Sequence, residues 1–219
     1  MVRSERAEVV PLPLPDRSDA DLVLAHRAED PHAMERLYRR HAAMLLGLAT
    51  RVLGQRSEAD DAVHDAFLKI LRRVDQLRKP DDFGRWASRI VLNECRKRLK
   101  RRRRYIFGSP EEAPHAAFER MASNSGDPEV ATELRWLATH IQRLPADERI
   151  VWMLRHVEGY ALEECASLAG CSLATVKRRL QRAERRLGTG SPSRGSGPAD
   201  VGQKRTARDA GTETEEAAR

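Results

Sequence analysis

The stretch ALEECASLAGCSLATVKRRLQRAERRL, residues 161–187, has the residue spacing of a helix-turn-helix. Ala166 is small where two helices must approach closely, and Gly170, four residues later, stands where the turn requires a positive φ angle. Val176 follows six residues further on and is expected to pack back against the first helix. The other members of the expected apolar seam are Leu162, Cys165, Leu168, Cys171 and Leu180. This spacing predicts two helices joined by a tight turn at Gly170.

The second helix of the pair is strongly basic. Residues 172–187 hold six Lys or Arg side chains and one Glu. Burial of the seam leaves the following side chains facing outward or flanking that face: Ser172, Thr175, Lys177, Arg178, Gln181, Arg182 and Arg185. Such a face offers the donors that read base edges and phosphates in the major groove. A solvated basic face on a structural bundle is the alternative, and the seam and turn spacing favour the DNA-reading helix over it.

The cysteines raise the alternative of a metal or redox site. His156, Cys165 and Cys171 lie in one region, but the spacing H-x8-C-x5-C is not typical of zinc sites. Both cysteines also stand at seam positions, where Cys acts as a small apolar residue. We therefore expect no metal and no cofactor. The three cysteines of the chain are few and odd in number, which favours unpaired thiols in a reducing compartment.

Charge is unevenly distributed along the 219 residues, whose formal net charge is +7. Residues 96–104 alone contribute eight positive charges, whereas residues 105–130 carry five acids and one base. Basic blocks of this kind favour an acidic partner such as nucleic acid. The sequence contains no apolar run of eighteen residues and no charged-then-apolar amino end, so we expect neither membrane insertion nor a signal peptide, and a cytoplasmic location.

Apolar periodicity predicts three amphipathic helices in the first half of the chain, and two more between residue 129 and the helix-turn-helix. The first starts at Asp30, with Pro31 in its first position, and ends at Gly54; the second begins at Ser57; the third runs from about Asp82 to Arg102. Tyr38, Phe67 and Leu71 are among the side chains expected in the core.

The predicted fold is all-α, with two small helical domains joined by a flexible acidic linker. The predicted segments are a disordered arm over 1–17, a three- to four-helix domain over 18–104, a linker over 105–128, a helix-turn-helix domain over 129–187 and a disordered tail over 188–219.

Two further outward faces have distinct compositions. An exposed Leu among charges on the second helix favours protein contact, with an ordinary solvated surface as the alternative; this face holds Asp61, His64, Asp65, Leu68 and Arg72. The third helix is uniformly basic along its solvent side and follows the loop QLRKPDD, residues 76–82. The helix is therefore suited to binding the backbone of a nucleic-acid strand, and the loop to receiving an unstacked base.

With these features in order, the sequence resembles bacterial sigma factors of the sigma-70 family, and most closely the extracytoplasmic-function (ECF) subfamily. The segment EADDAVHDAFLKILRRVDQLRKPDDFGRWASRIVLNECRKRL, residues 58–99, is similar to their core-binding and −10-reading segments. LPADERIVWMLRHVEGYALEECASLAGCSLATVKRRLQRAERRL, residues 144–187, is similar to their −35-reading domain. The resemblance spans about residues 18–187.

This resemblance implies a non-catalytic protein that binds core RNA polymerase and promoter DNA, works in the cytoplasm and at the nucleoid when active, and pairs with an anti-sigma factor. By position, the implied polymerase-binding residues are Asp61, His64, Asp65, Leu68 and Arg72. The implied −10 residues are Gln76, Arg78, Lys79, Arg85, Arg89, Asn93, Arg96 and Lys97, and the implied −35 residues are Ser172, Thr175, Lys177, Arg178, Gln181 and Arg182.

Some positions depart from the family pattern. Ala62 stands in place of the usual Leu and His64 in place of the usual Gln, while Arg178 occupies a position where Ser is frequent. We hypothesise that Arg178, a long bidentate donor, shifts the −35 preference toward guanine. The alternative function is a regulator that binds DNA through the helix-turn-helix and never contacts polymerase. We find no phosphate-binding Gly-rich loop, metal-ligand cluster or nucleophile–base pair that would indicate an enzyme.

Overall fold

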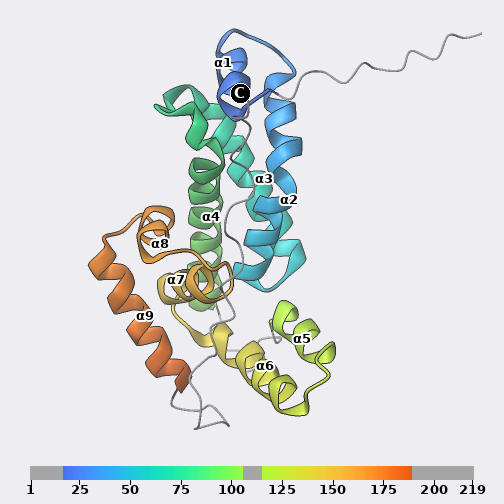
Figure 1. Ribbon diagram of the computed structural model, residues 1–219, viewed down its shortest axis with the longest axis vertical. Helices are drawn as coiled ribbons and strands as arrows, with labels where there is room; N and C mark the ends of the chain where they lie inside the picture. The colour runs from blue at the N-terminus through green and yellow to red at the C-terminus, as the bar shows by residue number, and fades with distance from the viewer. Residues whose placement is uncertain (1–16, 106–114, 189–219) are drawn as a thin grey trace, which may run out of the picture.

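The computed structural model describes residues 17–105 and 115–188, and every regular element in these two ranges is helical (Figure 1). The all-α prediction is therefore confirmed. We call the two ranges the N-terminal region and the C-terminal region. Nearly all of the predicted arm and tail lies outside the described residues.

The N-terminal region consists of four α-helices and two short 3-10 turns. They are α1 (Asp19–Arg27), α2 (Ala33–Leu53), α3 (Arg56–Arg73), the turns η1 (Val74–Gln76) and η2 (Pro80–Asp82), and α4 (Phe83–Tyr105). Helices α2, α3 and α4 pack against one another, and α1 covers the end of this bundle near η1 and η2. The bundle buries Leu37, Leu45, Ile70, Phe83 and Leu92 almost completely.

Local signals explain where the first helices begin. In α1, a helix that the sequence analysis did not identify, Ser18 and Asp21 form a reciprocal capping box. Helix α2 begins at Ala33, three residues after the predicted cap, because the Asp30 carboxylate accepts from the His32 amide at 3.0 Å in a preceding turn. Its end is as predicted, with Gly54 at φ 85°.

The C-terminal region contains two helical hairpins around α7. Its elements are α5 (Ala116–Ser123), α6 (Pro128–His140), η3 (Ile141–Arg143), α7 (Ala146–His156), α8 (Leu162–Ala169) and α9 (Leu173–Gly188). Helices α5 and α6 pack side by side, as do α8 and α9. Helix α5 lies within the segment 105–128 that was predicted as a flexible linker; Phe118 and Ala122 are buried, so the apolar content of this segment is used for packing.

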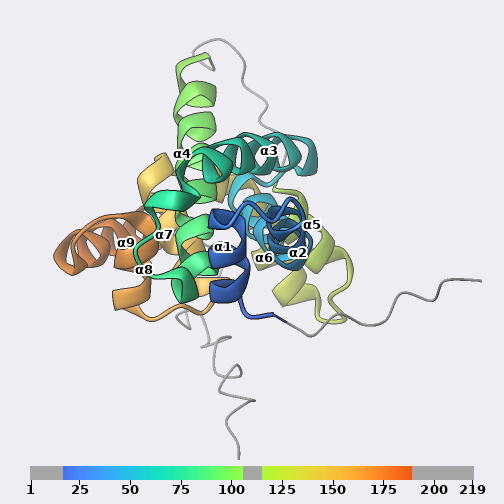
Figure 2. The ribbon, with the colours of Figure 1, turned by 90° about the horizontal axis from the view of Figure 1, so that it is seen from above.

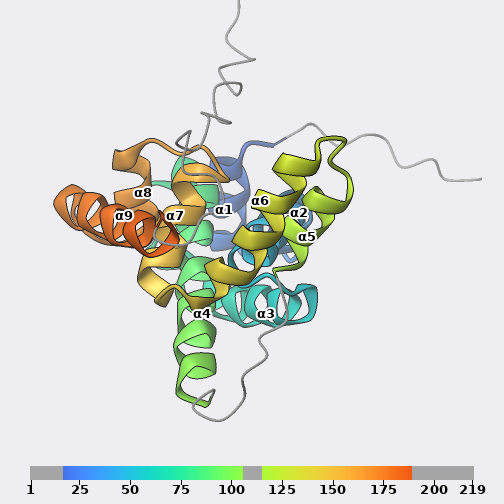
Figure 3. The same ribbon diagram turned by 90° about the horizontal axis from the view of Figure 1, so that it is seen from below.

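The two regions pack against each other rather than standing apart. Helix α4 contacts α7 and α8, and α2 contacts α7. The buried apolar residues of both regions form one continuous cluster. In Figures 2 and 3, α9 and α3 lie on opposite sides of α4.

Two expected core residues are exposed. Tyr38 is 46% exposed and Leu71 is 45% exposed, whereas Phe67 is buried as predicted. Both exceptions stand at the edge of their apolar stripe, where sequence periodicity does not separate core from boundary. No helix within residues 17–105 or 115–188 has the length and apolar character needed to cross a membrane.

Candidate functional site

The turn between α8 and α9 has the geometry that the sequence predicted. Gly170 adopts φ 65°, and the Cys171 amide donates to the Ala166 carbonyl at 3.1 Å, which closes the end of α8. Val176 and Cys165 are fully buried between the two helices. The helix-turn-helix is therefore confirmed as a folded unit.

The start of α9 is capped by two of the predicted −35 residues. The Thr175 amide donates to the Ser172 hydroxyl oxygen at 3.2 Å, and the two hydroxyl oxygens are 2.9 Å apart. These contacts fix the first turn of α9, where backbone amides are free to meet an anion. In this structure Ser172 and Thr175 therefore stabilise the beginning of α9.

The other predicted −35 residues share one exposed face of α9. Its opposite face buries Val176, Leu180, Ala183 and Leu187. The exposed face carries Lys177, Arg178, Gln181 and Arg182. This separation leaves the long donors of the predicted reading face directed away from the protein, as recognition of the major groove would require.

Two basic side chains of α9 are instead directed to acids of α7. Arg179 Nη2 lies 3.5 Å from Asp147 Oδ1, and Arg186 Nε lies 3.0 Å from Glu148 Oε2. These two arginines stabilise the packing of α9 on α7. Some basic side chains of α9 therefore bind acids within the protein, whereas others face outward.

Among the predicted −10 residues of α4, Lys97 lies toward α3, where it pairs with Glu94 at 3.1 Å beside Lys69. The others lie on the side of α4 that faces α8. Arg85 Nη2 lies 3.8 Å from Glu164 Oε1, and the Arg89 guanidinium lies beside Gly170, where a Cβ atom would be 3.1 Å from Arg89 Nη2. Asn93 is half-buried and accepts from Arg96. The structure brings these residues together on one face and covers some of that face with the helix-turn-helix.

Arg96 makes the most extensive of these contacts. Its Nε donates to Asp147 Oδ1 at 2.8 Å, and its Nη2 donates to the Ala169 carbonyl at 2.9 Å. Lys100 adds a second contact to Asp147 at 3.5 Å. Nearby cations outweigh burial and lower the pKa of the Asp147 carboxyl, so this group is ionised at neutral pH.

The backbone of the loop before α4 is held by hydrogen bonds from the end of α1. Arg27 Nη2 donates to the Leu77 carbonyl at 2.6 Å and to the Asp75 carbonyl at 3.2 Å. The predicted loop residues Gln76, Arg78 and Lys79 remain exposed. Sequence reasoning did not find Arg27, because no local signal relates a side chain of α1 to carbonyl groups about fifty residues away.

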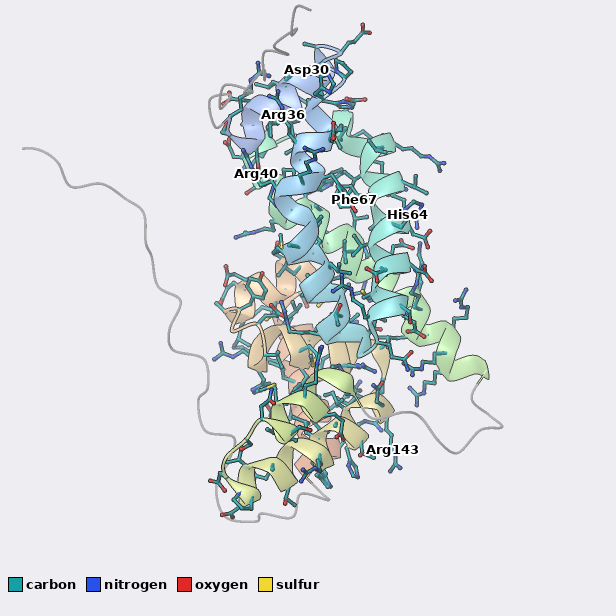
Figure 4. The ribbon with its side chains drawn as sticks, turned by 90° about the vertical axis from the view of Figure 1, so that its right-hand side faces the viewer. Asp30, Arg36, Arg40, His64, Phe67 and Arg143 are labelled. Atoms are coloured by element: carbon teal, nitrogen blue, oxygen red, sulfur yellow. The ribbon has the colours of Figure 1, made fainter. Side chains whose placement is uncertain are left out.

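The predicted polymerase-binding face lies on the outer side of α3. Asp61, His64, Leu68 and Arg72 are exposed, and Figure 4 shows His64 on this outer side while Phe67 lies between α3 and α2. Phe67 packs edge-on against Tyr38, with ring centroids 4.4 Å apart. Leu68 is 42% exposed, so the face combines charge with apolar surface.

Asp65, the fifth residue of that set, is partly engaged within the protein. Its carboxylate accepts from Arg98 Nη2 at 2.8 Å, and this hydrogen bond lowers the pKa of Asp65. Further along the same two helices, Arg102 lies 3.9 Å from Glu58, and Lys69 lies 2.5 Å from the buried Glu94. Some of the basic block over residues 96–104 thus holds α4 against α3.

The cysteine and histidine side chains do not gather into a metal site. Within residues 17–105 and 115–188, no three His, Cys, Asp or Glu side chains lie together in a way that could hold an ion. His156 lies 3.5 Å from Glu184. Burial raises the pKa of Cys95 to about 12 and that of Cys165 to about 11, which keeps both thiols protonated and unreactive.

Two family models and a curated protein are similar in sequence to this chain. The family model for sigma-70 region 2 matches residues 37–105, and that for sigma-70 region 4 matches residues 134–187. The ECF RNA polymerase sigma factor SigM of Mycobacterium tuberculosis is 33% identical over 172 residues, which cover 78% of this chain and 84% of that protein.

Two solved structures share the fold. One is CnrH in complex with the cytosolic domain of CnrY, with 25% identity, a TM-score of 0.52 and coverage of 79% of this chain and 96% of that one. The other is the sigma factor RpoE of Bartonella quintana in complex with the anti-sigma factor NepR, with 21% identity, a TM-score of 0.51 and coverage of 72% and 96%. The extent of the match to SigM and the two region matches show that this chain belongs to the ECF RNA polymerase sigma factors.

Proposed function

We propose that the protein binds core RNA polymerase and directs it to promoters by contacting their −35 and −10 elements, so that transcription can begin. The observation that carries this proposal is the presence, in one chain, of a folded helix-turn-helix with an exposed basic reading face and of a matched region 2. A polymerase-independent regulator would have no need of region 2. Its activity is binding and recruitment, and we propose that it performs no catalysis of its own.

In this proposal three surfaces of the protein make different contacts. The outer face of α3, with Asp61, His64, Leu68 and Arg72 exposed, is the polymerase contact. The exposed face of α9 reads the −35 element in the major groove. The basic side of α4 and the loop of residues 76–82 contact the −10 element, where base capture needs an unpaired strand.

Arg178 gives the −35 contact its expected specificity. Its side chain is exposed on the reading face, next to Lys177 and about one turn from Arg182. Arginine pairs with guanine through two hydrogen bonds to O6 and N7, which neither Ser nor Lys reproduces. We propose that in-vitro selection of promoters with the wild-type protein enriches a guanine that an Arg178→Ser variant does not enrich.

We further propose an anti-sigma partner and a site of action in the cytoplasm, at the nucleoid when active. Support for the partner comes from the relative of similar fold from Bartonella quintana, which was solved in complex with the anti-sigma factor NepR. The exposed apolar side chains of α3, Leu68 and Leu71, give a protein partner a surface to bury.

Gel filtration with core RNA polymerase tests the proposal. The wild type is expected to co-elute with the enzyme, and an Asp61→Arg/Leu68→Glu variant is expected to elute alone. Asp60→Arg is the matched control, because Asp60 is exposed on the same helix, pairs only locally with Arg56 at 3.2 Å and lies outside the predicted face. Promoter binding without co-elution of the wild type would instead favour the polymerase-independent regulator.

A further inference from the structure

The loop before α4, residues 76–82, is fixed in shape by a side chain that lies outside it. Arg27, in the last turn of α1, directs one guanidinium nitrogen to three backbone carbonyls. Its Nη2 lies 2.6 Å from the Leu77 oxygen, 3.2 Å from the Asp75 oxygen and 3.4 Å from the Val74 oxygen. A single side chain therefore binds both η1 and the residue that follows it.

Leu77 is the point at which this loop is anchored. Its side chain is buried, and its amide donates to the Val74 carbonyl at 3.1 Å. Carbonyl groups at the end of a helical turn have no donor within the turn, so Arg27 supplies the donor that η1 lacks. The side chains on either side of Leu77 are exposed: Gln76, Arg78 and Lys79. The loop thus combines a fixed backbone with exposed polar side chains.

Helix α1 is itself attached to the bundle at two places. Leu22 and Val23 are buried, and α1 contacts η1, η2 and α4. At the other end of α1, the Asp19 carboxylate accepts from Arg40 at 2.8 Å and lies 2.7 Å from His41 Nε2. Helix α1 therefore connects α2 to the loop before α4.

The turn after α1 determines where Arg27 stands. Glu29 adopts φ 64°, a conformation that residues other than glycine rarely adopt. The Glu29 amide donates to the His26 carbonyl and the Asp30 amide to the Ala25 carbonyl, both at 2.9 Å. Such a conformation persists only where the surrounding contacts determine it. The turn ends α1 directly after Arg27, which fixes the position of this side chain relative to the loop.

We propose that Arg27 is a positioning residue for −10 recognition. It holds the loop of residues 76–82 in the conformation that receives the unstacked base, and it thereby sets the rate and the base selectivity of promoter opening. The inference rests on the proposed function of this loop. Arg27 acts through the backbone carbonyls and does not itself contact DNA.

The physical reason is preorganisation. Fixing the backbone of a residue costs conformational entropy, so a loop that is already ordered loses less entropy when a base enters it. Without Arg27 the three carbonyls would bind water and the loop would sample other conformations. The cost would fall on base capture alone, because the proposed polymerase and −35 contacts lie on α3 and α9, away from α1 (Figure 1).

A direct contact with a phosphate is the competing role for Arg27, because the residue is exposed. Salt dependence separates the two roles. Loss of a phosphate contact reduces the salt slope of DNA binding by about 1, whereas loss of a side chain that binds only carbonyls leaves the slope unchanged.

Hydrogen exchange of the free, full-length chain tests the contact without DNA. Arg27→Met is expected to speed exchange of the Leu77 amide about tenfold, because the loop around its hydrogen bond to Val74 loosens. The Gly54 amide, which donates to the Thr50 carbonyl at 2.8 Å, is the internal control and should keep its wild-type rate. Unchanged exchange at Leu77 would overturn the proposal.

Arg17→Met is the matched substitution. Arg17 precedes the other end of α1, pairs with Asp30 at 3.2 Å and carries the same charge as Arg27, but it has no contact with the loop in this structure. Its loss should leave exchange at Leu77 and promoter opening unchanged. Equal effects of Arg17→Met and Arg27→Met would reduce the result to net charge and contradict positioning.

Promoter opening is measured with 2-aminopurine, a fluorescent adenine analogue whose emission rises when it unstacks. The analogue is placed in the −10 element of a promoter selected in vitro with the wild-type protein and core polymerase. Arg27→Met is expected to slow the rise about tenfold and to weaken base selectivity in the −10 element by a similar factor. Co-elution with polymerase and the salt slope should stay at their wild-type values.

Two outcomes of this assay would overturn the proposal: wild-type opening by Arg27→Met, or a salt slope lower by about 1, which would assign Arg27 to a phosphate. Arg27→Lys covers the case in which Arg27→Met does not fold. It keeps the charge on a shorter side chain with one nitrogen and should slow opening about threefold. Wild-type opening by Arg27→Lys would show that charge alone is sufficient and would contradict positioning.

Failure of the wild type to open any promoter would instead refute the proposed function. Faster exchange at Leu77 in the free Arg27→Met variant would still show that Arg27 orders the loop.

Discussion

Helices α4 and α9 are both strongly basic, yet the structure uses their charges differently. On α9 the apolar face is buried, and four donors of the proposed reading face are exposed. On α4 several basic side chains are already paired, with Arg98 bound to Asp65 and Arg96 bound to Asp147. A run of basic residues in a sequence therefore predicts a basic surface, but it does not show which of the side chains are free to bind DNA. That depends on whether acidic residues elsewhere in the chain pair with them.

The largest effect is expected on the buried face of α9. Val176→Asp places an unpaired carboxylate at a fully buried position between α8 and α9, which should reduce the free energy of unfolding by about 3 kcal/mol or more. Denaturant unfolding followed by circular dichroism measures the change. Gln181→Asp, on the exposed face of the same helix, should lose less than about 1 kcal/mol. Similar losses for the two variants would contradict the division of α9 into a buried and a reading face.

Acid is expected to weaken the packing of the C-terminal region on the end of α2, where His115 lies 2.6 Å from the Arg51 carbonyl. Burial, together with the positive charges of Arg149 and Arg102, lowers the pKa of His115 to about 4 from an ordinary value of 6.5. The unfolded chain thus takes up a proton at higher pH than the folded protein. The stability associated with neutral His115 is complete above pH 6.5 and is lost as the pH falls from 6.5 toward 4, by about 2–3 kcal/mol in total.

Unfolding free energies of the wild type and a His115→Gln variant, measured from about pH 7 to about pH 4, isolate this contribution. Other titrating groups, including Asp147 and His156, are common to both proteins and cancel in the difference. The wild type should lose more stability than the variant as the pH falls through this range. Parallel pH profiles would show that His115 is not buried in a neutral form.

Helix periodicity and turn chemistry made much of this molecule predictable from sequence. The helix-turn-helix depends on contacts between residues close together in the chain, so Gly170 and Val176 were sufficient to predict its turn and its seam. The outward face of α9 followed from that seam. Helix α1 was missed because nine residues after a proline-rich stretch carry little periodic signal.

The packing of the C-terminal region against α2 and α4 could not be predicted from the sequence, for a different reason. The pair between Arg96 and Asp147 joins residues 51 positions apart, and neither residue type nor spacing indicates that they meet. The same is true of Arg51 with Glu158, 107 positions apart. Contacts of this kind arise from the packing of whole helices, which the apolar periodicity of a single helix does not reveal.

A smaller effect is expected from single changes on the reading face of α9. Arg182→Ala or Lys177→Ala should weaken promoter binding by about 1–3 kcal/mol if the residue reads a base, or reduce the salt slope by about 1 if it contacts a phosphate. Titration of the polymerase complex with promoter DNA at several salt concentrations distinguishes the two roles. Unchanged affinity and slope in both variants would remove α9 as the reading helix.

The smallest effect tests the paired charges of α4. The Arg98 side chain is 15% exposed and bound to Asp65, so Arg98→Met should cost about 0.5–1 kcal/mol of stability and leave the salt slope of DNA binding unchanged. Arg101→Met, three residues along and exposed, is the matched substitution and should reduce that slope by about 1 while leaving stability nearly unchanged. The reverse result, with Arg98 setting the slope, would mean that its pair with Asp65 opens when DNA binds. Arg98 would then belong with the proposed DNA-contacting residues of α9, because a basic side chain contributes to DNA binding only if it is free to contact a phosphate in the bound state.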